Sequence, residues 1–76
     1  MLTLYHFEEC PYCQKVRAKL QELDVKYISV PCPRGSKNRA ELLELGSKEQ
    51  VPFIVDGGVK MYESGDIIAY LEEKYS

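Results

Sequence analysis

Short apolar stretches alternate with amphipathic stretches along the whole chain. Apolar and β-branched residues gather in four short runs and predict strands at residues 2–7, 26–30, 52–55 and 59–62. Between and after them, apolar residues recur at helical spacing and predict helices at about 11–23, about 37–45 and from Ser64 onward. The predicted order of elements is therefore β-α-β-α-β-β-α.

Local signals mark several of these boundaries. Pro11 suits a first helical position, where its missing N–H costs nothing. Ser36 and Ser64 are good helix N-caps, and Gly46 would end the second helix. Asp56-Gly57-Gly58 is a hairpin signal, whereas the first β-α-β unit implies a parallel pair with a right-handed crossover. We therefore expect an α/β fold with a four-stranded mixed sheet flanked by three helices.

Composition narrows the class of protein. The chain has 76 residues, which predicts one domain over 1–76. It is 45% hydrophobic with a net charge of −2, so it lacks the basic surplus of a nucleic-acid binder. No apolar run is long enough to cross a membrane and no signal-peptide pattern is visible, so we expect a cytoplasmic monomer. Three cysteines, an odd number, favour catalytic or metal-binding thiols over a structural disulfide framework.

Cys10-Pro11-Tyr12-Cys13 is the motif that carries chemistry. It follows a predicted strand and opens a predicted helix, where free N–H groups and the helix dipole favour a thiolate on Cys10. Cys13 lies one turn later, so its sulfur can reach Cys10. We expect Cys10 to be the attacking thiol and Cys13 the more buried, resolving thiol. Glu8 and Glu9 carry nearby negative charge, which works against the thiolate.

Three motifs occur in order along the chain: the cysteine pair after the first strand, Val51-Pro52 at the third strand and Glu63-Ser64 at the last helix. With these motifs the chain resembles the glutaredoxins of the thioredoxin superfamily. More narrowly, it resembles glutaredoxin-like proteins that share their sequence style with the N-terminal domain of glutathione S-transferases. The resemblance implies a thioredoxin-like fold and a dithiol–disulfide oxidoreductase.

The resemblance also implies substrates and exclusions. Such an enzyme reduces protein disulfides or mixed disulfides with glutathione or another low-molecular-weight thiol, and holds no tightly bound cofactor. Glutaredoxins typically carry a Gly-Gly pair where this chain has Glu63-Ser64, as the transferases do. The helical C-terminal domain of the transferases has no counterpart in these 76 residues. We therefore expect thiol–disulfide chemistry rather than transferase activity.

The resemblance assigns roles to five further residues. Pro52 would be a cis proline beside the thiols, and the Val51 backbone would pair with a bound cysteinyl backbone. Ser64 and the helix start would hold the α-carboxylate of a γ-glutamyl group, and Glu63 would pair with its α-ammonium. Tyr12 would be exposed and pack on the thiol substrate. Together with the redox disulfide of the cysteine pair, these residues form the expected site.

Other polar residues have plainer interpretations. Lys15, Arg34 and Lys37 could each meet the glycyl carboxylate of glutathione, although a solvated surface charge is the commoner role. Cys32 lies between two prolines, and we expect a partly exposed spare thiol; glutathionylation or dimer formation through it is the alternative. His6 fits a hydrogen-bonded strand histidine better than a catalytic base.

Two other functions remain open at this stage. The Cys-x-x-Cys pair could belong to a metal or iron–sulfur module, although two cysteines supply only half of a four-ligand site and no metal site is expected here. The chain could also be a non-redox glutathione-binding domain. The sequence identifies neither the protein substrate nor the electron donor, which could be glutathione, another thiol or a thioredoxin-type reductase.

Overall fold

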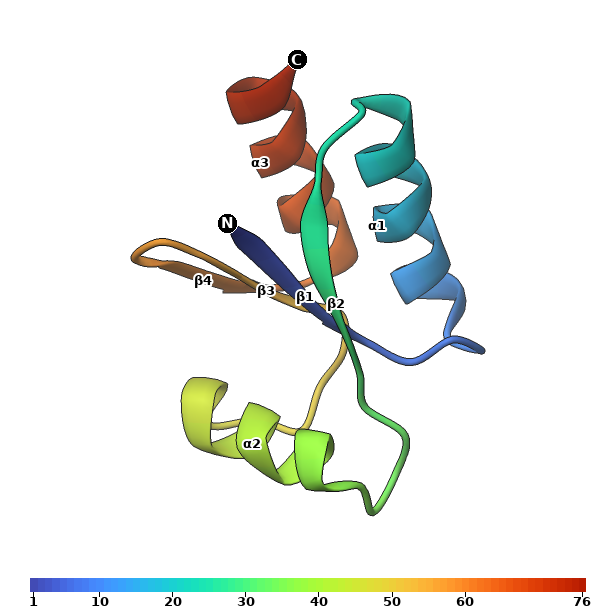
Figure 1. The fold of residues 1–76 in the computed structure, drawn as a ribbon, viewed down its shortest axis with the longest axis vertical. Coiled ribbons are helices and arrows are strands. Elements are labelled where there is room, and N and C mark those ends of the chain that lie inside the picture. Colours follow the sequence, from blue (N-terminus) through green and yellow to red (C-terminus); the bar gives the residue numbers. More distant parts are fainter.

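The computed structural model describes residues 1–76 and contains the expected elements in the expected order (Figure 1). The strands are β1 (Leu2–His6), β2 (Tyr27–Pro31), β3 (Phe53–Asp56) and β4 (Val59–Tyr62). The helices are α1 (Pro11–Glu22), α2 (Lys37–Gly46) and α3 (Ser64–Tyr75). None of these helices is long and apolar enough to serve as a membrane span.

The four strands form one mixed sheet in the order β2-β1-β3-β4. β1 and β2 are parallel, with Leu2 opposite Tyr27, while β3 is antiparallel to both β1 and β4. Gly57 and Gly58 form the two-residue turn of the β3–β4 hairpin, and Gly57 adopts φ +63°, a conformation that glycine accepts without strain. The predicted fold class is confirmed.

Two apolar clusters hold the layers together. α1 and α3 lie side by side on one face of the sheet (Figure 1). The larger cluster joins these two helices to the sheet and consists of Leu2, Leu4, Val16, Leu20, Ile54, Ile67 and Leu71. α2 lies apart from them (Figure 1). Between α2 and the sheet, a smaller cluster contains Tyr5, Cys32, Leu42 and Phe53. Burying each such side chain stabilises the fold by about 1.5–3 kcal/mol.

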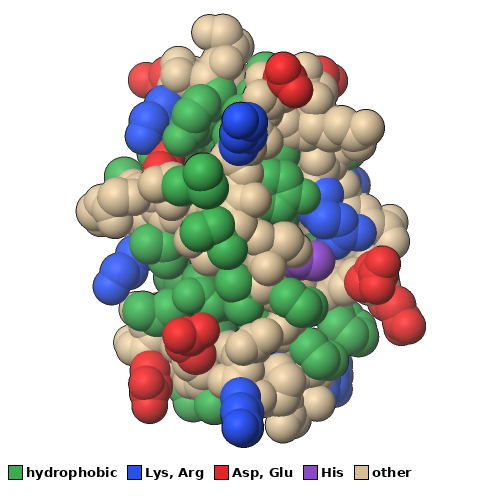
Figure 2. Space-filling view, viewed as in Figure 1, with side chains coloured by type: hydrophobic (Ala, Val, Ile, Leu, Met, Phe, Trp, Pro, Cys, Tyr) green, Lys and Arg blue, Asp and Glu red, His purple; other side chains and the backbone are tan.

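Part of the sheet surface stays open. On the face seen in Figure 2, apolar side chains gather over the sheet, while the charged side chains lie mainly around them. Ile28 on the edge strand β2 is 49% exposed. α2 therefore covers only part of the side of the sheet that faces away from α1 and α3.

Several predicted strand boundaries were wrong by one residue. The first strand ends at His6 rather than at residue 7, because the Phe7 N–H donates to Cys13 Sγ instead of a neighbouring strand. The second spans Tyr27–Pro31 rather than 26–30. The third begins at Phe53 rather than at residue 52, because Pro52 has no N–H to offer a ladder.

Helix ends also differ from the prediction. Gly46 remains inside α2, and Ser47 forms the C-cap at φ +69° with its N–H donating to Leu43 O over 2.8 Å. A Cβ atom at Gly46 would collide with the Tyr62 hydroxyl, so the glycine serves packing. The first helix ends at Glu22 rather than at residue 23. Ser36 is confirmed as the N-cap of α2, since its Oγ accepts the Arg39 N–H at 3.1 Å.

Candidate active site

Cys10 occupies the N-cap position of α1. Its backbone is extended (φ −77°, ψ 119°), its N–H donates to Phe7 O, and its C=O accepts the Gln14 N–H, each over 3.0 Å. Pro11 follows at the first helical position, as predicted. No side chain caps the helix start, so its free N–H groups remain available to the partly exposed Cys10 sulfur. The Cys10 sulfur therefore lies at the positive end of the α1 dipole.

Cys13 has the opposite environment. Its side chain is fully buried, and its Sγ accepts the Phe7 N–H at 3.5 Å. Burial raises the pKa of the Cys13 thiol to about 12; the Phe7 N–H opposes this rise, and the neighbouring Cys10 thiol adds to it. Both cysteines are free thiols in this structure. At neutral pH Cys13 is therefore protonated and hidden, as expected of a resolving thiol.

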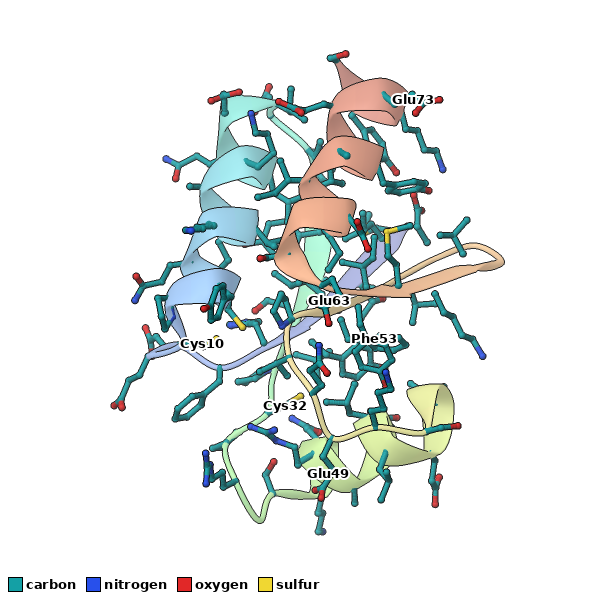
Figure 3. The ribbon with its side chains drawn as sticks, turned by 180° about the vertical axis from the view of Figure 1, so that it is seen from behind. Cys10, Cys32, Glu49, Phe53, Glu63 and Glu73 are labelled. Carbon is teal, nitrogen blue, oxygen red and sulfur yellow. The ribbon has the colours of Figure 1, made fainter.

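An open cleft of about 800 Å³ begins at Cys10. Three loops and α2 form its walls, through Phe7, Glu9, Cys10, Arg34, Gly35, Arg39, Glu49, Gln50 and Val51. Cys10 and Glu63 lie at the starts of α1 and α3, and Glu49 lies across the gap beside α2 (Figure 3). The cleft thus separates the cysteine pair from the α2 region.

A second cleft, of about 440 Å³, continues from the first. It is lined by Tyr12, Gln50, Val51, Pro52, Glu63 and Ser64. The two clefts share Gln50 and Val51, so they adjoin each other. All five residues that the resemblance assigned to substrate binding therefore line this second cleft, which adjoins the cleft that begins at Cys10. Tyr12, as predicted, is largely exposed, at 58%.

Val51 lines both clefts, and its backbone N–H and C=O are unpaired. The two adjoining clefts are together called the groove. The Val51–Pro52 peptide bond is cis, as the resemblance implied. Pairing of β3 with its neighbours begins only at Phe53, and neither the N–H nor the C=O of Val51 makes a hydrogen bond in the structure. Both groups are free to pair with an extended ligand, as one strand pairs with another.

Glu63 and Ser64 differ in part from their predicted positions. Glu63, not Ser64, is the N-cap of α3, and Ser64 is the first helical residue. Glu63 has φ +69° and ψ 114°, a conformation that non-glycine residues rarely adopt and that occurs mostly at functional sites. The first helical hydrogen bond of α3 runs from Ile67 N–H to Glu63 O, which leaves the N–H groups of the first turn free for an anion.

Gln50 is a site residue that the sequence analysis missed. Its Nε2 donates to Glu63 Oε1 over 2.8 Å, and it lines both clefts. This contact fixes the direction of the Glu63 carboxylate. The sole signal for Gln50 in the sequence is its position directly before Val51-Pro52, which carries no information about the partner of its side chain.

The basic residues divide into two groups. Arg34 lines the first cleft, whereas Lys15 lies over the Tyr12 ring, 5.7 Å from its centroid, and Lys37 lines neither cleft. Arg39 was not predicted: its Nε donates to Cys32 O and its guanidinium donates to Glu49 O, each over 2.9 Å. Arg39 therefore joins the two loops that form the far wall of the first cleft.

The expectation of a partly exposed Cys32 was wrong. Cys32 is fully buried, its N–H donates to His6 O, and its Sγ donates to Val30 O over 3.4 Å. The reason is that β2 stays paired with β1 through Pro31, so the Cys32 side chain points into the cluster between α2 and the sheet. Burial raises the pKa of the Cys32 thiol. His6 is confirmed as a buried, hydrogen-bonded strand histidine.

Metal ligands do not gather anywhere in the chain. No three His, Cys, Asp or Glu side chains come together in an arrangement that could hold a metal ion. A metal bound at the cysteine pair would need ligands from another molecule.

Comparison with known proteins identifies the family. The family model described as glutathione S-transferase, N-terminal domain, matches residues 4–76, and the chain belongs to this family. In an alignment of 83 positions it is 36% identical to the disulfide-bond oxidoreductase YfcG of Escherichia coli (strain K12), covering 97% of this chain and 38% of that protein.

Solved structures agree with this assignment. A glutathione S-transferase from the Antarctic clam Laternula elliptica superposes with a TM-score of 0.87 at 38% identity, covering 97% of this chain and 35% of that chain. A glutathione transferase homolog from Drosophila mojavensis with bound glutathione superposes with a TM-score of 0.88 at 28% identity, covering 97% and 35%. The chain spans little more than a third of the length of these relatives.

Proposed function

We propose that residues 1–76 form a glutaredoxin-like domain that catalyses thiol–disulfide exchange with glutathione as co-substrate. The observation that carries this proposal is the cysteine pair itself. A partly exposed Cys10 opens α1, and a buried Cys13 lies one turn behind it, beside a groove with an unused backbone segment. The E. coli relative is named a disulfide-bond oxidoreductase, and the D. mojavensis structure holds glutathione. Both names support this chemistry.

Glutathione fits the groove in one orientation. Its cysteinyl backbone pairs with the free N–H and C=O of Val51, which places its sulfur toward Cys10. Its γ-glutamyl carboxylate meets Ser64 and the free N–H groups at the start of α3, and its ammonium meets Glu63. Arg34, on the opposite side, is the cation available for the glycyl carboxylate. Tyr12 packs against the bound thiol.

The mixed disulfide is reduced through two displacements at the cysteine pair. The Cys10 thiolate attacks the glutathione sulfur of a mixed disulfide, and the substrate protein leaves as a thiolate that takes a proton from water. Cys13 then loses its proton and attacks the Cys10 sulfur, which releases glutathione and leaves a Cys10–Cys13 disulfide. Two further glutathione molecules reduce this disulfide and end as glutathione disulfide. The sum consumes one glutathione for each mixed disulfide reduced.

Serine variants test the assignment of roles. Cys10→Ser should abolish the reduction of disulfides and of glutathione mixed disulfides, because no attacking thiol remains. Cys13→Ser should retain activity on glutathione mixed disulfides, where a second glutathione can replace it, but lose the reduction of protein disulfides. Cys32→Ala is the control, since it removes the thiol outside the pair and should keep both activities. Equal loss in the Cys10 and Cys13 variants would contradict the proposed roles.

The electron donor needs a separate assay. Turnover of a mixed disulfide should be compared with glutathione plus glutathione reductase and with a thioredoxin-type reductase as the source of electrons. The free first turn of α3 and the Glu63 carboxylate match a γ-glutamyl group, so we expect the glutathione system to be the better donor. A clear preference for the thioredoxin-type reductase would refute the assignment of glutathione.

A further inference from the structure

Arg17 lies close to the cysteine pair but lines neither cleft. It follows Cys13 by four residues, so the two side chains lie on the same side of α1. Its guanidinium lies 3.2 Å from His6 Nδ1 and donates to the Glu8 carbonyl over 3.3 Å. Arg17 therefore connects α1, the end of β1 and the loop that leads to Cys10.

The partner of Arg17 on β1 is a neutral imidazole. A guanidinium can only donate hydrogen bonds, so His6 Nδ1 must accept, and the ring proton lies on Nε2, which donates to Ser29 Oγ over 2.6 Å. Burial and then the Arg17 charge lower the pKa of His6, against a smaller effect of Glu8. Arg17 takes part in none of the ion pairs of the chain. The Arg17 guanidinium therefore has no carboxylate within ion-pair distance.

Two properties of Cys13 depend on this arrangement. The hydrogen bond that its sulfur accepts comes from the Phe7 N–H, in the loop that Arg17 contacts through the Glu8 carbonyl. Burial raises the pKa of Cys13, and the Arg17 charge acts in the opposite direction. The titratable or charged groups that act on Cys13 are Cys10 and Arg17. Arg17 is thus the only one of them that favours the Cys13 thiolate.

We propose that Arg17 is a positioning residue for the resolving step, which holds the Phe7 N–H against Cys13 and stabilises the Cys13 thiolate as it forms. This inference rests on the proposed oxidoreductase function. In the step concerned, the Cys13 proton passes to water and the Cys13 thiolate attacks the Cys10 sulfur. The bond between Cys10 and the bound thiol breaks, and that thiol leaves as a thiolate with the electron pair.

A chromogenic disulfide isolates this step. The reduced protein is mixed with dithiobis(nitrobenzoate) in a stopped-flow instrument. One coloured thiolate is released as Cys10 forms a mixed disulfide with the reagent, and a second as Cys13 attacks the Cys10 sulfur. Arg17→Gln should slow the second release several-fold near neutral pH and move its pH profile upward, because a nearby cation favours the thiolate over the thiol. The first release should change little.

Matched variants separate charge from structure. Lys19→Gln removes one positive charge from the same helix, where Lys19 pairs with Glu22 and Glu72, and should leave the second release unchanged. Arg17→Lys keeps the charge and should restore most of the pH profile. If Arg17→Gln does not fold, Arg17→Met keeps the apolar stem and should show the same slow release.

The outcomes distinguish the two proposals. An unchanged rate and pH profile in the Arg17→Gln protein, or an equal shift in the Lys19→Gln protein, would overturn the role of Arg17. If the wild-type protein releases only the first thiolate, the dithiol mechanism itself fails, and the inference fails with it.

Discussion

The two sides of the sheet are built by different means. On the side of α1 and α3, an apolar cluster of seven fully or almost fully buried residues joins both helices to the strands. On the side of α2, the cluster has four buried members, and polar contacts do much of the joining. Arg39 bridges two loop carbonyls there, and the Tyr62 hydroxyl donates to Lys48 O over 3.0 Å.

This difference matters for the site, because the first cleft lies between the start of α1 and the α2 region. The cysteine pair and the start of α3 belong to the well-packed side, which holds these residues in place. Arg34, Arg39 and Glu49 belong to the α2 side, which forms the far wall of the first cleft. Regions with fewer buried apolar contacts open at lower free-energy cost. The chain thus combines a well-packed wall that carries the cysteine pair with a less densely packed wall beside α2.

A pair of matched leucine variants tests this contrast most strongly. Leu20→Ala in α1 should lower the free energy of unfolding by about 4 kcal/mol, and Leu42→Ala in α2 by about 2–3 kcal/mol. Leu42→Ala should also raise KM for a glutathione mixed disulfide several-fold, because α2 carries Arg39, whereas Leu20→Ala should leave KM unchanged. Urea unfolding and steady-state kinetics measure the two effects. Equal costs with unchanged KM values would show that the two sides are equivalent.

The well-packed side also has a polar anchor at the end of β3 remote from the cysteines. Asp56 is 8% exposed, and its Oδ2 accepts hydrogen bonds from Tyr70, Lys74 and Tyr75 in the second half of α3. Burial alone would raise the pKa of Asp56, but the Lys74 ammonium and the two tyrosine hydroxyls outweigh it and lower this pKa to about 2. The ionised carboxylate is therefore the form that holds α3.

Asp56→Asn should therefore cost about 2 kcal/mol of stability near neutral pH, the equivalent of the pKa difference from 3.8. Because the folded-state pKa is the lower one, this contribution is present above about pH 4 and is lost as the pH falls through about 2. Urea midpoints across this range should fall for the wild type and converge on those of the variant. Asp24→Asn, an exposed control, should behave as wild type.

A smaller effect is expected at the start of α2. Ser36→Ala removes the side chain that accepts the Arg39 N–H and should cost about 1 kcal/mol. Since α2 is thinly packed, the loss should appear as faster amide hydrogen exchange in the first turn of α2, with α1 unaffected. Faster exchange throughout α1 as well would indicate that the two sides unfold together.

The sequence predicts much of this molecule because its signals are local. The strand runs, the Ser36 cap and the Gly57-Gly58 turn each act within a few residues, and the motif order then places the cleft-lining residues on one wall. The larger misses depend on distant groups. Cys32 is buried because β1 and β2 pair one residue further than expected, and Arg39 acquires its partners from two separate loops. The positive φ of Glu63 likewise has no signature in its own side chain.

The burial of two of the three thiols has a practical consequence. Cys13 and Cys32 are sealed from solvent, and Cys10 alone is partly open. Towards an alkylating reagent, the folded, reduced protein therefore behaves as a molecule with a single accessible thiol, and all three thiols react only when the chain opens. Modification of Cys13 or of Cys32 therefore reports which side of the sheet has opened.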